Sequence, residues 1–336
     1  MCVAKEWVPV ALHENPDRPG AEIKVGVSAC LLGTKVRFDG GHKRDRFVTD
    51  SLADCFQLIP YCPEVAIGMG IPRQPIRLVG SPQDPRAVGV KRPELDVTAD
   101  LQRYGKQVGK RIGDLCGFIF KKDSPSCGMA RVKVYNQKGM AERNGTGLFA
   151  RELMQAEPLL PVEEEGRLND PHLRDNFITR VFVYARWKTM RAEGVSKSTL
   201  IGFHTCHKYL LMAHDMVAYR ELGRLLADLH RQPLEATADT YIARLMRALG
   251  TPATRKRHTN VLQHLMGYLK RDLDAARRAD LNEAIDAYRR GIYPLVVPIR
   301  LLQHHFSACP KPYILQQAYL NPHPASLMLR NSHGGR

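Results

Sequence analysis

The fold is decided by the stretch Ile23-Lys24-Val25-Gly26-Val27-Ser28-Ala29-Cys30, a run of strand length that ends in a cysteine. Two later apolar runs, Phe56–Tyr61 and Leu115–Phe120, have a similar length and are followed by turn residues. Helical candidates accompany these runs at Thr49–Asp54, Thr98–Asp114 and Gly147–Gln155. Because the middle one is long enough for a crossover between parallel strands, the alternation predicts an α/β, Rossmann-like parallel-sheet domain over residues 22–160.

The remaining segments divide the chain further. Two stretches rich in Gly and Pro, Gly68–Pro75 and Val79–Pro93, predict loops. Residues 161–179, which carry three consecutive glutamates with Pro, Gly and Asn, predict a linker, and residues 1–21 an N-terminal extension. Beyond the linker, apolar residues recur at helical spacing almost to the end. An all-α domain is therefore expected over residues 180–330.

The composition is that of a folded protein, with 44% apolar and 25% charged residues among 336. No apolar run approaches the roughly 18 residues that a membrane span requires, and the first residues lack the features of a signal peptide. We therefore expect a cytoplasmic protein without membrane association, and no obligatory protein partner is evident. In a reducing compartment its eight cysteines would be free, metal-bound or catalytic, and none forms a C-x-x-C pair.

The charge is strongly basic and unevenly distributed. The net charge is +16, but residues 1–170 hold 25 Lys and Arg against 22 Asp and Glu, whereas residues 171–336 hold 25 against 12. A polyanionic partner is the natural inference for the second half.

Three cysteines follow the three predicted strands. Cys30 and Cys62 come directly after two of the runs, and Cys127 lies in the loop after the third. Because the carboxyl ends of parallel strands gather at one edge of a sheet, three distant thiols can meet there. Thiolates favour an iron–sulfur cluster or zinc, and buried core cysteines are the equally weighted alternative. Cys55 and Cys116, inside predicted elements, are expected to be core residues.

The context of these cysteines resembles the thiouracil desulfidase family over about residues 22–157. The matching segments are Ser28-Ala29-Cys30-Leu31-Leu32-Gly33, Val36-Arg37-Phe38-Asp39-Gly40, Tyr61-Cys62-Pro63-Glu64-Val65, Pro72-Arg73 and Asp123-Ser124-Pro125-Ser126-Cys127-Gly128. Five motifs in the same order make the resemblance specific.

The resemblance implies a [4Fe–4S] cluster with three protein ligands, which would be Cys30, Cys62 and Cys127. Its fourth iron would bind the sulfur of a thiolated uracil, and oxygen would replace that sulfur without redox chemistry. Glu64 and Ser124 would be the acid/base pair. Either could instead only cap its own turn. Several cations near these motifs could bind a phosphate or simply face water: Arg37, Lys43, Arg73, Lys121 and Lys122.

The helical half resembles a domain family long described as uncharacterised, found alone or behind the desulfidase domain. Segments that carry the resemblance include Gly202-Phe203-His204-Thr205-Cys206-His207-Lys208-Tyr209 and Arg257-His258-Thr259-Asn260. The fused arrangement resembles that of desulfidases which convert 4-thiouridine in tRNA to uridine, and the basic charge agrees with a tRNA partner. Candidate RNA contacts open one helix or lie on others: Lys208, Arg255, Lys256, Arg257, His258, Lys270 and Arg271.

Other interpretations remain open at this point. The chain could act on free thiouracil or thiouridine nucleotides, it could be an RNA-binding or redox-sensing protein with a non-catalytic cluster, or its three cysteines could hold zinc. A second metal on His204, Cys206, His207 and His214 is disfavoured, because helical spacing puts Cys206 on a different face from His207 and His214.

Overall fold

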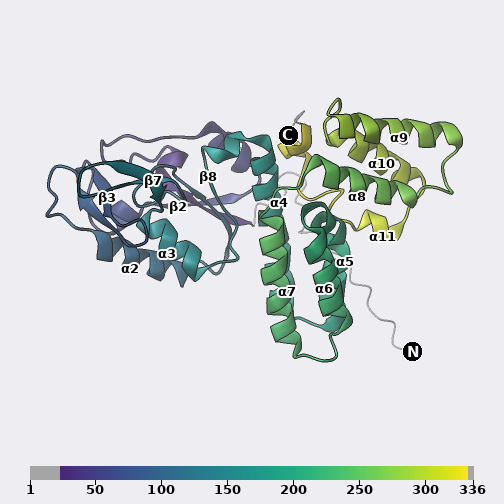
Figure 1. Cartoon of the computed structure of the whole chain (residues 1–336), viewed down its shortest axis with the longest axis horizontal. Helices are drawn as coiled ribbons and strands as arrows, with labels where there is room; N and C mark the ends of the chain where they lie inside the picture. The colour runs from purple at the N-terminus through teal and green to yellow at the C-terminus, as the bar shows by residue number, and fades with distance from the viewer. Residues whose placement is uncertain (1–22, 332–336) are drawn as a thin grey trace. The chain divides into compact units, whose positions relative to one another are not determined.

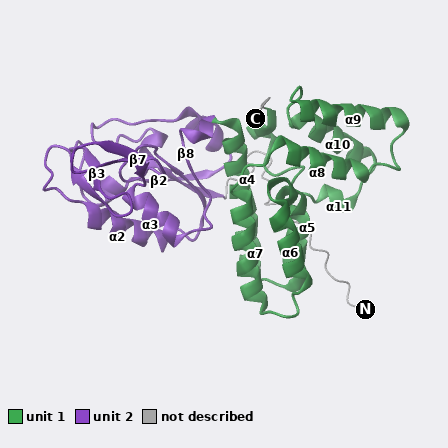
Figure 2. Cartoon of the chain, in the orientation of Figure 1, with its two compact units in different colours: residues 1–13, 170–336 green, residues 14–169 purple. Residues whose placement is uncertain are grey.

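Two units make up the chain in the computed structural model, which describes residues 23–331 (Figure 1). The first unit along the described chain extends to Asn169 and is purple in Figure 2 (unit 2 of its key), and the second begins at Asp170 and is green (unit 1 of its key). The predicted N-terminal extension, residues 1–21, lies outside the described residues.

The first unit is built on a parallel sheet of four strands in the order β2-β1-β5-β8. Its strands are β1 (Lys24–Ser28), β2 (Gln57–Tyr61), β5 (Leu115–Phe120) and β8 (Val162–Glu164). The three predicted apolar runs are thus confirmed as strands. They are adjacent in the sheet, so their carboxyl ends lie at one edge.

Tight packing beside β1 explains why its centre is a glycine. A Cβ atom on Gly26 would lie 2.3 Å from the ring of Phe118 in β5. That ring contacts Phe120, with 4.4 Å between the ring centroids, and both rings pack near Phe149. All three phenylalanines are fully buried, so the core of this unit lies directly beneath the strands that carry the cysteines.

The helices of this unit follow the prediction with shifted ends. Helix α2 (Thr98–Gly109) is shorter than the predicted Thr98–Asp114, and α3 is Leu148–Ala156. The segment near Thr49–Asp54 forms a π-helical turn, η2 (Phe47–Leu52), rather than an α-helix. Short turns η1 (Ala29–Leu32) and α1 (Pro63–Ala66) directly follow β1 and β2.

A second sheet, with strand order β4-β3-β6-β7, corrects one prediction. Its strands are β3 (Ile76–Gly80), β4 (Pro85–Gly89), β6 (Val132–Tyr135) and β7 (Ala141–Gly145). The prediction of a loop over Val79–Pro93 is wrong, because β3 and β4 form an antiparallel hairpin there. Pro85 is compatible with this hairpin because it is the first residue of an edge strand, where the missing N–H is tolerated.

The segment predicted as a linker, residues 161–179, differs from that prediction. It contains β8, the short turn η3 (Arg167–Asn169) and the start of helix α4 at Pro171. The three glutamates are buried, and each has a partner: Glu163 pairs with Arg167, Glu164 accepts from the Met129 N–H, and Glu165 pairs with Lys121. The three glutamates, which by sequence predict a solvated linker, therefore form ion pairs and a hydrogen bond inside the unit.

The second unit is helical, as predicted. Its helices are α4 (Pro171–Glu193), α5 (Lys197–His214), α6 (Met216–Ala227), α7 (Leu234–Leu249), α8 (Arg255–Gly267), α9 (Ala275–Arg290), α10 (Val296–Ala308) and α11 (Pro312–Leu315), followed by turns η4 (Ala325–Leu327) and η5 (Leu329–Asn331). Side-chain oxygens of Asp170, Ser196, Asp215, Thr254 and Asp274 cap five helix N-termini. Within residues 23–331, no helix combines the length and apolarity needed to cross a membrane.

Candidate functional site

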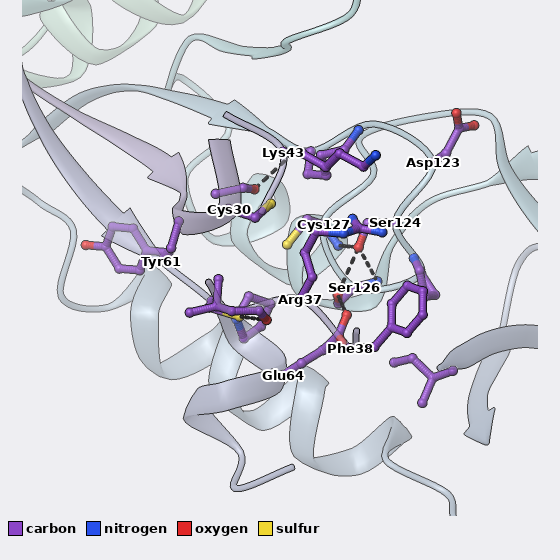
Figure 3. A pocket seen from close by; sticks show the side chains of 18 of the residues that line it. Cys30, Arg37, Phe38, Lys43, Tyr61, Glu64, Asp123, Ser124, Ser126 and Cys127 are labelled. Atoms are coloured by element: carbon purple, nitrogen blue, oxygen red, sulfur yellow. Dashed lines mark hydrogen bonds between the residues drawn. The ribbon is translucent and has the colours of Figure 1, made fainter. Parts of the chain in front are cut away.

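A cavity of about 420 Å³ lies at the carboxyl ends of β1, β2 and β5. Cys30, Cys62 and Cys127 all line it, and Figure 3 labels Cys30 and Cys127. Cys30 is in the turn η1 after β1, Cys62 is the N-cap residue of α1 after β2, and Cys127 is in the loop after β5. The fold therefore brings together the three thiols that the strand-end pattern singles out.

The loop of Cys127 is held tightly from both sides. Its backbone turns back on itself, with the Gly128 N–H donating to the Ser124 carbonyl at 2.8 Å. The start of α3 closes over it, since a Cβ atom on Gly147 would lie 2.6 Å from the backbone of Ser126. The Ala150 N–H also donates to the Ser126 carbonyl at 3.1 Å. The side chains of this loop are consequently presented to the cavity from a fixed backbone.

Burial is the largest influence on the pKa of each of the three thiols. It raises the pKa of Cys30 to about 11, against the opposing effect of nearby Lys121 and Arg37. Burial likewise raises the pKa of Cys62 and of Cys127, and the Ser28 hydroxyl partly offsets the increase at Cys127. The bare thiols are therefore protonated at neutral pH, and any metal centre that they hold must displace those protons.

The donor set fits an iron–sulfur cluster. Three soft sulfur donors around one cavity suit an iron–sulfur cluster, and the cations Arg37 and Lys121 beside Cys30 suit a centre that carries negative charge. Over residues 23–331, no group of three or more His, Cys, Asp or Glu side chains is arranged to hold a single metal ion.

Glu64 is oriented by an arginine. Its Oε2 accepts from Arg73 Nε at 2.8 Å, and a second guanidinium nitrogen lies 2.7 Å away. The remaining donors of Arg73 bond the carbonyls of Val36 and Gly70, at 2.9 and 3.1 Å. The Arg73 side chain is only 5% exposed and that of Glu64 14%, so this ion pair has a fixed geometry within the cavity wall.

Glu64 and Ser124 belong to one hydrogen-bonded chain. Ser126 Oγ donates to Glu64 Oε1 at 2.6 Å and lies 3.0 Å from Ser124 Oγ. Figure 3 shows the three side chains in a row along one side of the cavity. Both ends of this row are candidates from the sequence, whereas Ser126, in the same motif as Ser124, is not, because only the fold shows that it faces Glu64.

The cations predicted near the site all line the cavity. Lys121 Nζ pairs with Glu165, whose other oxygen accepts from the Lys122 N–H at 2.8 Å. Arg37 lies over the Phe38 ring at 5.2 Å, and the Lys43 N–H donates to the Cys30 carbonyl at 2.9 Å. Glutamates thus anchor two of these cations: the half-buried Glu64 pairs with Arg73, and the buried Glu165 pairs with Lys121.

The predicted RNA contacts of the helical unit occupy different environments. Lys256, Lys270 and Arg271 are exposed, the last two in the turn after α8 rather than on a helix. Lys208 lies over the rings of Tyr209 and Tyr313, and Arg257 donates to the His214 carbonyl. His258 is buried against Tyr319, with 3.0 Å between its Nδ1 and the phenol oxygen, so it faces the interior of the unit.

The histidines near Cys206 have separate partners. His204 Nδ1 lies 3.2 Å from the Tyr241 hydroxyl, whereas His207 and His214 each bond a backbone carbonyl through Nδ1 at 2.7 Å. These contacts give each ring a local structural role.

The comparisons with known proteins cover both units. The family model for 2-thiouracil desulfurase matches residues 25–165, and the model described as a protein of unknown function (DUF1722) matches residues 208–324. The uncharacterized protein YbgA of Escherichia coli (strain K12) is 31% identical over 166 residues, which are 49% of this chain and 98% of that protein. The uncharacterized protein YbbK of Bacillus subtilis (strain 168) is 30% identical over 156 residues, which are 43% of this chain and 97% of that protein.

One solved structure is also similar, described as the [4Fe-4S]-dependent thiouracil desulfidase TudS. It is 30% identical, has a TM-score of 0.36, and the match covers 44% of this chain and 94% of that chain. The match of the 2-thiouracil desulfurase model to residues 25–165 confirms the family resemblance of the sequence motifs for the unit that carries the cavity. The chain belongs to the 2-thiouracil desulfurase family through residues 25–165, and it carries a DUF1722 domain at residues 208–324.

Proposed function

We propose that the chain removes sulfur from 4-thiouridine in tRNA, producing uridine and sulfide. The observation that carries the proposal is the single cavity shared by three cysteines and the acid/base candidates Glu64 and Ser124. Membership of the 2-thiouracil desulfurase family supports a thiolated uracil as the reacting group.

The cofactor of the proposal is a [4Fe–4S] cluster held by Cys30, Cys62 and Cys127. Bound through three protein ligands, it would supply one iron as a Lewis acid with a soft preference for the sulfur of the substrate. The protein contributes two buried thiols, Cys30 and Cys127, the partly buried Cys62, and a positive charge from Arg37 and Lys121 beside Cys30.

Glu64 and Ser124 would carry the proton transfers. Glu64, held in place by Arg73, is the base that takes a proton from the attacking water, whose oxygen bonds to the carbon bearing sulfur. The carbon–sulfur bond then breaks, and Ser124 returns a proton to the substrate. One water is consumed and one sulfide leaves, so no oxidant or reductant is required.

The helical unit is the proposed tRNA-binding part. Its half of the chain carries 25 basic against 12 acidic residues, and Lys256, Lys270 and Arg271 are exposed on it. Neutralising phosphates by exposed cations gives affinity for a nucleic acid irrespective of base sequence. A small neutral base has no need of such a charge, which favours tRNA over free thiouracil.

The test is a comparison of three substrates. The full chain, reconstituted anaerobically with iron and sulfide, is given free 4-thiouracil, 4-thiouridine monophosphate and bulk tRNA containing 4-thiouridine, with the Cys30→Ala variant as the inactive control. We expect the highest kcat/KM for tRNA. Preference for the free base would refute the tRNA substrate, and a bound cluster without turnover of any substrate would instead identify a non-catalytic iron–sulfur protein.

A further inference from the structure

Ser126 lies at the middle of the row of polar side chains in the cavity. Its hydroxyl is 2.6 Å from Glu64 Oε1 and 3.0 Å from Ser124 Oγ, and the residue is 1% exposed. Water therefore has little access to this hydroxyl, and its two partners are the two residues proposed to move protons.

The directions of these hydrogen bonds follow from the number of hydrogens available. An ionised carboxylate only accepts, so Ser126 gives its single hydroxyl proton to Glu64. The contact between the serines must then be a donation from Ser124 to Ser126. Ser124 Oγ in turn accepts from the N–H groups of Ser126 and Cys127, at 3.3 and 3.1 Å. The chain thus has one direction, from Ser124 through Ser126 to Glu64.

We propose that Ser126 is a positioning residue that couples Glu64 to Ser124, so that the two act as one unit. This inference rests on the proposed function of the cavity. The physical reason is that Glu64 and Ser124 have no direct hydrogen bond in the described structure, and Ser126 supplies the connection between them.

The coupling has a consequence for the reaction. When Glu64 takes a proton from water, its carboxyl group becomes a donor, and the direction of the chain reverses. Glu64 then donates to Ser126, Ser126 donates to Ser124, and the proton of Ser124 is free to pass to the substrate. One proton enters the row at Glu64 and one leaves it at Ser124, so the row is ready for another turnover after the two hydroxyls reorient.

Backbone contacts fix the position of Ser126. The Ser126 carbonyl is bonded by the Ala150 N–H of α3, and Gly147 leaves no space for the loop to shift toward that helix. At the other end, Arg73 fixes Glu64 through its second oxygen. A hydroxyl held between two fixed partners is suited to orientation, since little reorganisation is needed during the reaction.

The test compares Ser126→Ala with Ser81→Ala, a matched control in the exposed β3–β4 turn, where the hydroxyl contacts only Gln83 among the described residues. Both variants are reconstituted, and iron content, kcat and KM are measured. We expect Ser126→Ala to keep its cluster and its KM while kcat falls roughly 10- to 100-fold, as for other residues that orient a site. In a Glu64→Gln background the same change should have little further effect on kcat.

Two further variants keep the test decisive if Ser126→Ala loses its cluster. Ser126→Thr retains a hydroxyl and Ser126→Cys a weaker donor, so kcat per bound cluster should follow the order Ser, Thr, Cys. Equal kcat per cluster in all forms, or full additivity with Glu64→Gln, would overturn the inference. Wild-type protein that is inactive on every thiolated substrate would refute the proposed function itself, which is a distinguishable result.

Discussion

The two units use the same residue types in opposite ways. In the α/β unit, three cysteines separated by most of the domain line one cavity, because each follows a strand of the same parallel sheet. In the helical unit, Cys206, His207 and His214 are close in sequence, yet the histidines bond separate backbone carbonyls. Position relative to the sheet edge is therefore a better indication of a shared site than proximity along the chain.

Charge is also used differently in the two units. Two cations around the cavity are fixed by carboxylates, Arg73 by Glu64 and Lys121 by Glu165. The helical unit instead has an excess of cations, of which Lys256 and Lys270 are exposed. The first arrangement suits orientation of reacting groups, and the second suits a diffuse attraction for phosphates.

Removing a cysteine should have the largest effect on activity when the cysteine lines the cavity of the α/β unit, and little effect when it lies in the helical unit. Alanine at Cys30, Cys62 or Cys127 is expected to abolish cluster binding and desulfuration, because three ligands are the minimum for the proposed centre. Iron content and turnover are the measurements. Cys309→Ala, in the helical unit, is the control and should retain both. Full iron content in any of the three variants would contradict the ligand assignment.

Removing an acid/base group should leave the cluster but slow the chemistry. Glu64→Gln and Ser124→Ala are expected to lower kcat by roughly 10²- to 10⁴-fold with iron content unchanged. The exposed Glu142→Gln variant should behave as wild type. Single-turnover rates on thiolated substrate measure the effect. Wild-type rates for both variants would identify a centre that is not catalytic through these residues.

Acid should destabilise the helical unit selectively. Burial lowers the pKa of His207 and His258 to about 3 and that of His214 to about 4, from 6.5. The unfolded chain therefore binds protons that the folded unit excludes, and stability is lost as pH falls from about 6.5 toward 4. Each histidine contributes up to about 1.4 kcal/mol per pH unit. Calorimetry should show the unfolding temperature of this unit falling as the pH is lowered from 7 to 4.5. A constant unfolding temperature would contradict the presence of buried neutral histidines in the folded unit.

Salt should distinguish tRNA from small substrates. Raising the salt concentration from about 50 to 200 mM is expected to increase KM for tRNA roughly tenfold or more, because condensed counterions compete with the basic unit. KM for 4-thiouridine monophosphate should change much less, since that substrate meets only the cavity. Parallel salt dependence for the two substrates would indicate that the basic unit takes no part in binding.

Substituting single exposed cations of the helical unit should have the smallest effects on tRNA desulfuration. Lys256→Ala, Lys270→Ala and Arg271→Ala are each expected to raise KM for tRNA a few-fold and to reduce the salt slope by about one. Their effect on kcat should be negligible. Lys110→Ala, an exposed position of the α/β unit, is the control. Equal effects from the control would show that net charge alone matters.

The parts of the fold that could be predicted share a physical basis. Strands β1 and β5 are marked by apolar runs because they are buried on both faces of the sheet, whereas β2 is an edge strand whose residues are partly or fully exposed. The cysteines follow those runs directly or within one loop, so their convergence could also be anticipated. The helical unit was predictable from periodicity, although the ends of its helices depend on caps such as Asp170 and Ser196.

The parts that could not be predicted depend on contacts between distant residues. The three consecutive glutamates at 163–165 predict a solvated linker when the sequence is considered alone. Their partners, Arg167, the Met129 N–H and Lys121, are known only from the structure. Ser126 gains its importance only from Glu64, 62 positions away in sequence. His258 was a candidate RNA contact on the basis of its basic neighbours, but α8 turns it toward Tyr319.

The placement of the cysteines after three strands also determines the order in which the protein can be assembled. Cys30 and Cys127 are separated by most of the domain and become neighbours only after β1 and β5 have paired. The unfolded chain therefore contains no preformed site, and the sheet must form before a cluster can be inserted. In contrast to small zinc domains, whose folding free energy comes from the metal, this unit has its own buried aromatic core. Chelation should accordingly remove the proposed cluster and leave a folded protein that can be loaded again.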